Sequence, residues 1–431
     1  MNSVWNQTTN PKPRPALCGD KKADVLIIGG GMCGILTAHF LKAAGVHPIV
    51  VEGAQIGGGV TQNTTAKITA QHGLIYADLI TRFGRERARQ YFDANTRAIA
   101  QYHTLAEQVP CDFEYKTAHV YSTASKETLL REMEACQKLN ISARLIEHLD
   151  LPLQTAGAVA MEGQAQFHPL KLLYALAADL EVYEDTFVQK LEGNIAHTSK
   201  GEIAAERIVL ATHYPLVNLL GLYFLKLYQH RSYVLALEDA PLIDGMFLDE
   251  QETGLSFRTY GDLLLVGGGD HKTGKCDGGF QALRRFVKDA YPQVRTKHHW
   301  ATQDCMSLDK VPYIGRHRGG SSDLFVATGF NKWGMTGSMV AAQVLTDLIV
   351  QGKSAYEALY SPRRSILSKQ LFVNVGAAAV GLLTPGAPRC THMGCKLHEN
   401  TAERSWDCAC HGSRFDMDGQ VITGPAKKEL K

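Results

Sequence analysis

The sequence predicts an α/β fold with a parallel sheet near its N-terminus, followed by a β-rich region and a small C-terminal module. Three observations support this fold class. Residues 24–52 alternate strand, turn, helix and strand, residues 229–300 hold several apolar β-runs, and four of the ten cysteines crowd into residues 390–410. At roughly 150 residues per domain, the 431 residues provide for about two to three domains.

The overall composition is that of an ordinary globular protein. With 45% hydrophobic and 20% charged residues, disorder or a fibrous repeat is excluded as the main state. Lys and Arg number 45 against 43 Asp and Glu, so the net charge of +2 gives no reason to expect a nucleic-acid partner. Residues 1–20 are polar and Pro-rich, unlike a signal peptide, and no apolar run is long enough to span a bilayer. We therefore expect a cytoplasmic protein without a transmembrane segment.

Residues 24–52 predict a βαβ unit. The run DVLIIGGG is an apolar strand that ends in glycines, residues 32–44 have apolar side chains at helical spacing, and HPIVVE is a second strand. Such a unit places its two strands parallel, joined by a right-handed crossover.

The later segments continue the alternation of strands and helices. We expect a long amphipathic helix pair over 77–108, strands on both sides of one helix over 111–165, a helix that starts near Pro169, and a buried strand in RIVLATH. Residues 229–300 predict several strands. DLFVATGF predicts a strand and a turn before the helix MVAAQVLTDLIV, and the polar, basic residues 353–370 predict a linker.

The turn after the first strand carries the pattern G-x-G-x-x-G, formed by Gly29, Gly31 and Gly34. Gly29 permits the tight turn, Gly31 lets the backbone approach a pyrophosphate, and Gly34 allows close helix–strand packing. Glu52 ends the second strand about 20 residues later, where an acceptor for ribose hydroxyls is expected. The alternative is a plain tight turn, but the strand, helix and acid together predict a dinucleotide site.

Further motifs distinguish FAD from NAD. A Gly/Thr-rich loop with Thr61 follows Glu52, a later strand ends at Thr212, and ATGFNKWGMTGS begins at Ala327. With these segments the sequence resembles the FAD-dependent oxidoreductases of the glycine/D-amino-acid oxidase (DAO) type over residues 22–352. The resemblance implies FAD as cofactor, a discontinuous Rossmann-like FAD-binding domain and an antiparallel α+β substrate domain.

The resemblance also implies how the chain is divided. The FAD-binding segments are about 22–80, 150–215 and 300–352, and the substrate domain is about 110–150 and 216–300. The late glycine turn would direct backbone N–H groups at the flavin ring or ribityl chain. The predicted cofactor-binding residues are Gly29, Gly31, Gly34, Glu52, Thr61, Thr212, Gly329, Gly334, Met335 and Thr336.

Three residues are candidates for catalysis. Lys67 matches a basic residue beside the flavin in amine oxidases and could stabilise negative charge on reduced flavin; the alternative is a solvated lysine. Arg258 could clamp a substrate carboxylate, or be an exposed strand arginine. His72 lies near a loop end that could face the flavin, and a structural histidine is the alternative. Leu265 stands near the position of a Lys that assists O2 reduction in amine oxidases, which favours a dehydrogenase.

The C-terminal cysteines and histidines lie in two loops, CTHMGC and CACHGS. Cys390, His392, Cys408 and His411 follow the pattern C-x-H, fifteen residues, C-x-x-H. Two Cys and two His could bind zinc in a tetrahedral site. The two loops, however, resemble the cluster loops of Rieske [2Fe–2S] proteins of the cytochrome bc type.

The Rieske resemblance implies a small all-β iron–sulfur module over residues 371–431. One iron would take the two outer cysteines and the other iron the two histidines; the implied ligands are Cys390, Cys408, His392 and His411. The remaining pair, Cys395 and Cys410, would form a disulfide between the loops. Because little sequence follows the second loop, we expect the module to lean on the flavin domains.

The residues around the expected cluster predict its reduction potential. Hydroxyl groups that donate to cluster sulfurs raise the potential by stabilising the reduced state. Ser413 matches such a donor, whereas Phe415 stands where the bc-type family has Tyr. We therefore expect a potential below the top of the Rieske range.

A chain with both groups predicts an internal electron relay. In this reading, a small-molecule substrate, an amine or amino acid, is oxidised by hydride transfer to FAD. The electrons then pass singly through the cluster to an external partner such as ferredoxin or quinone. Two alternatives stay open: a reductase fed by a ferredoxin-like donor, and a non-enzymatic redox-sensing or electron-carrying protein. A Rieske oxygenase is disfavoured, because no separate mononuclear iron domain is visible.

Overall fold

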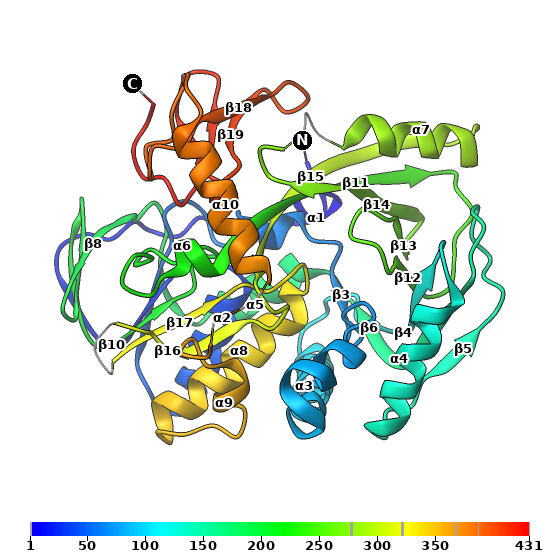
Figure 1. The fold of residues 1–431 in the computed structure, drawn as a ribbon. Coiled ribbons are helices and arrows are strands. Elements are labelled where there is room, and N and C mark those ends of the chain that lie inside the picture. The colour runs from blue at the N-terminus through cyan, green and yellow to red at the C-terminus, as the bar shows by residue number, and fades with distance from the viewer. Residues whose placement is uncertain are drawn as a thin grey trace.

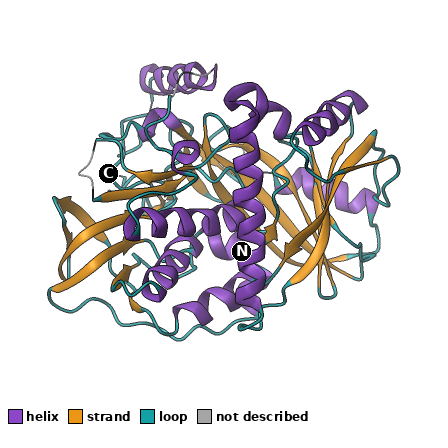
Figure 2. Ribbon diagram, turned by 90° about the horizontal axis from the view of Figure 1, so that it is seen from below, coloured by secondary structure: helices purple, strands orange, loops and turns teal. Residues whose placement is uncertain are grey.

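The strands form two large sheets and one small sheet (Figure 1) in the computed structural model. It describes residues 2–275, 279–319, 323–365, 367, 369–386 and 388–430. Seen from below, helices gather between the strands of the two large sheets (Figure 2). Within these residues, no helix combines the length and the apolar character needed to cross a membrane.

The first large sheet contains the predicted parallel strands. Its order is β16-β17-β10-β1-β2-β7, and the five strands from β17 to β7 run parallel. Val25, Leu26 and Ile27 of β1 are completely buried, as expected for a parallel sheet with both faces covered. The strands are β1 (Lys21–Ile28), β2 (Pro48–Val51), β7 (Glu181–Tyr183), β10 (Gly201–Leu210), β16 (Tyr313–Arg316) and β17 (Leu324–Thr328), with the hairpin β8 (Val188–Glu192) and β9 (Ile195–Thr198) beside β10.

Helices α2 (Met32–Ala43), α5 (Pro169–Ala177) and α8 (Gly334–Val350) pack against one another beside this sheet. The predicted helix pair is α3 (Tyr76–Ala106), which changes direction at Gly84, where φ is +79°. Only glycine adopts this backbone conformation at little cost, so Gly84 sets the point where the two helical parts meet. Near the N-terminus, α1 (Val4–Gln7) buries Trp5, whose Nε1 donates a hydrogen bond to the Thr64 carbonyl at 2.8 Å.

The second large sheet has the order β15-β11-β14-β13-β12-β4-β6-β3 and is mainly antiparallel. This sheet includes more of the chain than the segments that we predicted for the substrate domain. Strand β6 and most of β15 lie in segments that we expected in the FAD-binding domain. Its strands are β3 (Lys67–Ile68), β4 (Glu114–Ser122), β5 (Arg144–Ile146), β6 (Gly157–Gln166), β11 (Leu227–Glu238), β12 (Met246–Asp249), β13 (Ser256–Tyr260), β14 (Leu263–Lys272) and β15 (Arg295–Ser307), and α4 (Lys126–Lys138) and α7 (Phe280–Ala290) pack on it.

The C-terminal module is an antiparallel sheet of four strands, β18 (Leu397–Asn400), β19 (Ser405–Cys408), β20 (Arg414–Asp416) and β21 (Val421–Thr423). The start of the predicted all-β region differs, since Lys369–Leu383 forms helix α10. This run lacks the apolar–polar alternation of a strand and is rich in Ala and Leu, which favour helix. In Figure 1, α10 extends from the module toward α6 (Tyr223–Lys226).

The expected linker is attached to the part of the chain that forms the two large sheets, called here the flavin domains. It contains α9 (Glu357–Tyr360), and the buried Arg364 forms an ion pair with Asp309 at 2.7 Å. Residues 366 and 368 of this segment lie outside the described residues.

Candidate active site and metal centre

The glycine turn between β1 and α2 has the geometry that its sequence predicts. Gly29 has φ +115°, and a Cβ there would lie 2.5 Å from the Ala211 carbonyl oxygen. A Cβ on Gly34 would overlap the carbonyl of Gly29. Gly31, the residue before α2, has no side chain that could cap the helix. Its place leaves room for an anion at the N-terminus of α2.

Glu52 and Thr61 support this turn from either side. The Glu52 carboxylate accepts hydrogen bonds from the backbone N–H groups of Gly30 at 2.8 Å and Ala54 at 3.0 Å. Thr61 Oγ1 accepts from the Met32 N–H at 3.1 Å. Both side chains line a cavity of about 550 Å³, called here the glycine-turn cavity.

The glycine-turn cavity brings distant segments together. Its wall includes Gly29, Gly31, Glu52, Thr61, Thr212, Gly334 and Met335, seven of the predicted cofactor-binding residues. Gly334 opens α8, whose first turn also lacks a side-chain cap among the described residues. Two helix starts, a carboxylate and hydroxyl groups therefore line one cavity. These residues fit a dinucleotide with a flavin ring.

The second cavity, of about 400 Å³, lies against the second large sheet and is called here the sheet cavity. Lys67 and His72 line it, together with Tyr233 of β11. The two cavities share the wall residues Val60, Asp304, Lys332, Gly334 and Met335. Because the cavities adjoin at these residues, a substrate in the sheet cavity would meet a flavin in the glycine-turn cavity.

The two cavity-lining candidates have strongly shifted pKa values. Burial, reinforced by the nearby Arg258 and opposed by Asp270, lowers the pKa of Lys67 to about 7. Burial lowers the pKa of His72 to about 3, so this imidazole is neutral. Its Nδ1 lies 2.6 Å from the Tyr91 hydroxyl, and its ring stacks on Trp333 at a centroid distance of 4.7 Å. These contacts fix the orientation of His72 at the cavity wall.

Arg258 has surroundings unlike those of the predicted carboxylate clamp. It is completely buried and does not line either cavity. Its Nη1 donates to the carbonyls of Thr65 at 2.8 Å and Ala66 at 2.9 Å, and its guanidinium lies over the Trp5 ring at 5.5 Å. Arg258 therefore holds the segment just before Lys67.

Thr336 and Gly329 lie behind the cavity walls. Thr336 Oγ1 donates to the Thr69 carbonyl and accepts from the Thr69 N–H, each at 3.0 Å, which ties α8 to the segment after β3. Gly329 has φ +73° in the late turn. Both residues shape the site from outside the two cavities.

Asp304 and Lys332 lie where the cavities meet, although neither was among the predicted site residues. Lys332 forms an ion pair with Asp270 at 2.9 Å, and burial raises the pKa of Asp304 to about 6. Lys332 lies inside the late glycine motif, so this motif could have indicated it as a site residue. Asp304 has no sequence motif of its own, and only its place on β15 beside β11 brings it to the site.

The four predicted metal ligands come together as two pairs. The thiol groups of Cys390 and Cys408 share a hydrogen bond, and both residues are buried. The rings of His392 and His411 lie 4.9 Å apart and nearly perpendicular. Both ring nitrogens of His392, and Nδ1 of His411, are buried without a hydrogen-bond partner among the described residues. Buried thiols with unpartnered imidazole nitrogens fit a cluster that takes two sulfur and two nitrogen ligands.

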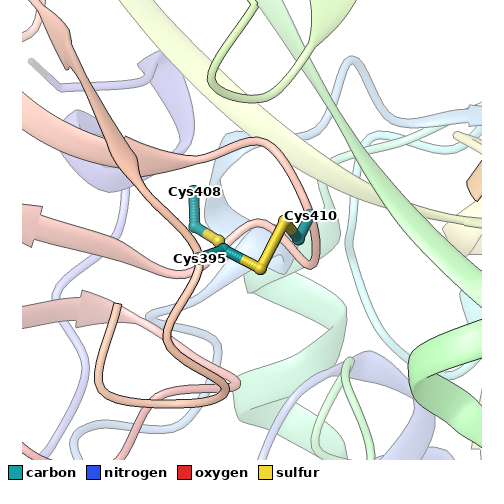
Figure 3. Close-up of side chains that lie close together, drawn as sticks. All are labelled: Cys395, Cys408 and Cys410. Carbon is teal, nitrogen blue, oxygen red and sulfur yellow. A yellow bond between two sulfur atoms is a disulfide. The ribbon is translucent and has the colours of Figure 1, made fainter. Parts of the chain in front are cut away.

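The structure contains a disulfide between Cys395 and Cys410, and the Cys408 sulfur lies close to it (Figure 3). The three sulfur atoms lie within 4.8 Å of one another. The disulfide occupies two of them, which leaves Cys408 with Cys390 as the thiol pair. Helix α10 covers the bridge at Gly381, where a Cβ would lie only 2.6 Å from the Cys410 sulfur.

The rings of the two predicted ligand histidines, His392 and His411, face the flavin domains. The His392 ring lies edge-on to Tyr214 at 6.4 Å, and the His411 ring lies edge-on to Phe224 at the same distance. Tyr214 lines the glycine-turn cavity as well, so one side chain joins the two candidate cofactor sites.

Comparison with known proteins agrees with this division. The chain matches the family described as FAD dependent oxidoreductase over residues 24–348, and the Rieske [2Fe-2S] domain over residues 368–431. The Rieske 2Fe-2S iron-sulfur protein YhfW of Bacillus subtilis (strain 168) is 34% identical, over 100% of this chain and 97% of the relative. The cytochrome b6-f complex iron-sulfur subunit 1 of Nostoc sp. (strain PCC 7120) is 41% identical over 15% of this chain and 30% of that protein.

Solved structures with the same fold cover the flavin part of the chain. L-proline dehydrogenase from P. horikoshii has a TM-score of 0.66 at 19% identity, over 80% of this chain and 98% of its own. Glycine oxidase from Geobacillus kaustophilus has a TM-score of 0.67 at 20% identity, over 80% of this chain and 100% of its own. The predicted α/β fold with an antiparallel second domain is thus confirmed. The chain belongs to the FAD-dependent oxidoreductases and carries a C-terminal Rieske [2Fe–2S] domain, so that it is an oxidoreductase with both cofactors.

Proposed function

We propose that this enzyme oxidises an amine or amino acid in the sheet cavity and passes the electrons singly through the Rieske module to an external acceptor. A substrate oxidised by hydride transfer delivers two electrons together, whereas a Rieske centre carries one at a time. The acceptor is a one-electron carrier such as ferredoxin, or a quinone reduced in two successive steps. The relatives named above as an amino-acid dehydrogenase and an amino-acid oxidase support the substrate class.

The observation that carries this proposal is the position of the two histidines. Both rings face the flavin domains, through Tyr214 and Phe224, and His411 is only 2% exposed. The side of the module that carries His392 and His411 is called here the histidine edge. An electron that enters or leaves the module at this edge therefore passes next to the glycine-turn cavity before it could reach solvent. This arrangement favours exchange within the chain over direct exchange between the histidine edge and a docked protein.

We assign the cluster ligands as Cys390, His392, Cys408 and His411, on the pairing and burial described above. We assign the FAD contacts to the glycine turn, Glu52, Thr61, Thr212, Gly334 and Met335, because these line one cavity. Thr336 and Gly329 act by positioning the start of α8 and the late turn before it.

Lys67 is our candidate for stabilising negative charge on the reduced cofactor. With a pKa of about 7, its ammonium group is charged below pH 7 and neutral above it. We therefore expect cofactor reduction by substrate to become less favourable as the pH rises through 7. In Lys67→Met the part of this dependence centred near pH 7 should disappear, leaving the pH dependence of the flavin's own protonation, and an unchanged pH profile of the flavin potential would refute the role. In this proposal His72 positions Trp333, and Arg258 positions the segment that leads into Lys67.

An anaerobic titration with a panel of amines and amino acids tests the relay. The flavin absorbance band and the reduced-Rieske EPR signal are followed together. We expect one substrate class to bleach the flavin, after which the EPR signal appears. A bleached flavin with a cluster that stays oxidised would refute the relay. Reduction by ferredoxin but by no amine or amino acid would instead establish the reductase direction, and the absence of any reducing substrate class would favour a redox sensor.

A further inference from the structure

We infer that the segment 421–427 of the Rieske module is part of the FAD-binding site, so that FAD binding and cluster retention stabilise each other. This inference rests on the two cofactors and is independent of the substrate and of the direction of electron flow. It concerns a wall of the FAD site that lies outside the FAD-dependent oxidoreductase domain, which ends at residue 348.

The first observation is the composition of the glycine-turn cavity. Besides the glycine turn, its wall contains residues of the Rieske module, from β21 and the loop after it. These residues are Val421, Ile422, Gly424, Pro425, Ala426 and Lys427. Ile422 is 49% exposed, so about half of this apolar side chain is in contact with water. A bound cofactor in the cavity would remove part of this side chain from water.

The second observation is that hydrogen bonds attach the same segment to both cluster loops. The Ala426 N–H donates to Ser413 Oγ at 3.0 Å, and the Ser413 hydroxyl in turn bonds to the Cys390 sulfur. Beyond the segment's end, the Lys428 carbonyl accepts from Thr391 Oγ1 at 2.5 Å. Thr391 lies between Cys390 and His392, and Ser413 lies two residues after His411. The segment therefore has one side on the FAD cavity and the other on the cluster loops.

Mutual stabilisation follows from this geometry. Metal binding to a small module is coupled to its folding, so the bound cluster holds the loops and the segment in place. A ligand that binds only the ordered segment then binds more tightly when the cluster is present. By thermodynamic linkage, the ligand must shift the equilibrium against loss of the cluster by the same factor.

The first experiment measures FAD affinity of the FAD-stripped full chain with its cluster retained, by quenching of FAD fluorescence. Ile422→Ala should weaken FAD binding by about four- to fifteenfold, the effect expected when about one to two of the removed carbon atoms are buried against the cofactor. Met417→Ala is the matched control, because Met417 is an exposed apolar residue of the same module and does not line the cavity. Lys427→Ala is a second cavity-facing variant, to be used if Ile422→Ala does not retain the cluster.

The second experiment tests the reciprocal effect without any turnover. Cluster loss in the presence of a chelator is followed by visible circular dichroism, with and without saturating FAD. We expect FAD to protect the cluster in the unmodified chain and in Met417→Ala, and to protect it less in Ile422→Ala at a fixed low FAD concentration. Equal FAD affinity in the cavity-facing and control variants, together with cluster loss that is the same with and without FAD, would overturn the inference.

Discussion

Two of the contacts between the Rieske module and the flavin domains have opposite character. In the ionic contact, Glu403 bonds to Arg231 of β11, to Arg414 at 2.9 Å and to the Tyr233 hydroxyl at 2.8 Å. Asp407 completes it by pairing with Arg414 at 2.9 Å. In the ring contact, His392 and His411 meet Tyr214 and Phe224 edge-on. In the ionic contact, each charged group has an oppositely charged partner. In the ring contact, imidazole nitrogens of His392 and His411 have no hydrogen-bond partner among the described residues.

This difference separates attachment from chemistry. The Arg231 and Glu403 side chains are only 5% and 3% exposed, so each charge depends on its partner for compensation. Such a contact fixes the register of the two domains. The ring contact offers little attachment energy, but its unpartnered nitrogens are available to a metal cluster. The ionic contact therefore determines how the ring contact is aligned with the glycine-turn cavity.

The largest effect is expected from removing a cluster ligand. Cys408→Ser should abolish the cluster, because a neutral hydroxyl replaces a thiolate that an iron needs. Iron and acid-labile sulfide analysis, with EPR of the reduced protein, measures this loss. Cys136→Ser is the control, since Cys136 is a buried free cysteine of α4 and lines neither cavity. Full cluster content in Cys408→Ser would refute the ligand assignment.

The next largest effect is expected at the ionic contact. Glu403→Ala leaves Arg231 without its partner and should lower the free energy of unfolding by about 3–5 kcal/mol. Guanidinium unfolding, followed at the cluster absorbance, measures the change. Glu399→Ala is the control on the neighbouring strand, where an exposed carboxylate should contribute less than about 0.5 kcal/mol. Equal unfolding midpoints for both variants would show that the ionic contact does not hold the module.

A smaller effect is expected at the ring contact. Tyr214→Leu removes an aromatic contact of about 0.5–1.5 kcal/mol and loosens the packing against His392. We expect a longer delay between flavin bleaching and appearance of the EPR signal in rapid-freeze experiments. Tyr214→Phe keeps the ring and should behave nearly like the unmodified chain. If the Leu and Phe variants show the same delay, the ring contact has no part in electron transfer.

The smallest effect is expected from pH. Burial pushes the pKa of Glu403 upward, but Arg231 and Arg414 outweigh it and hold the pKa below the usual 4.5. The unfolded chain then binds the proton more readily, so the contribution of Glu403 is present above pH 4.5 and is lost as the pH falls through the folded pKa. Stability should thus vary little through this group between about pH 5 and 9. Unfolding midpoints of Glu403→Gln should lack the acid-side decline, and an unchanged decline would assign it to other groups.

Local motifs made the cofactor loops predictable from sequence. The turn at Gly29, the acid at Glu52 and the cysteine–histidine spacing from Cys390 to His411 each lie within a short stretch of chain. Their geometry depends mainly on neighbouring residues, so the pattern alone suffices. The cofactors and the enzyme class followed from the same motifs and are confirmed.

The remaining parts of the site depend on tertiary contacts. Asp304 reaches the cavity through strand pairing, and Arg258 is turned inward by Trp5, which lies in a segment that appeared merely polar and Pro-rich. Helix α10 packs against the Cys395–Cys410 disulfide, and no local sequence pattern indicates this contact. The substrate, the redox partner and the cytoplasmic location stay predictions, because none of them is written in a short motif.

The glycine-turn cavity has one more consequence, for the life of the newly made chain. Its walls include Gly29 from near the N-terminus and Ala426 from near the C-terminus. Contacts between residues so distant in sequence form late, because the long intervening loop must first be closed. A nascent chain whose residues 421–427 have not yet left the ribosome therefore lacks one wall of this cavity. If FAD binds there, its complete site forms only after the module that carries the iron has been made.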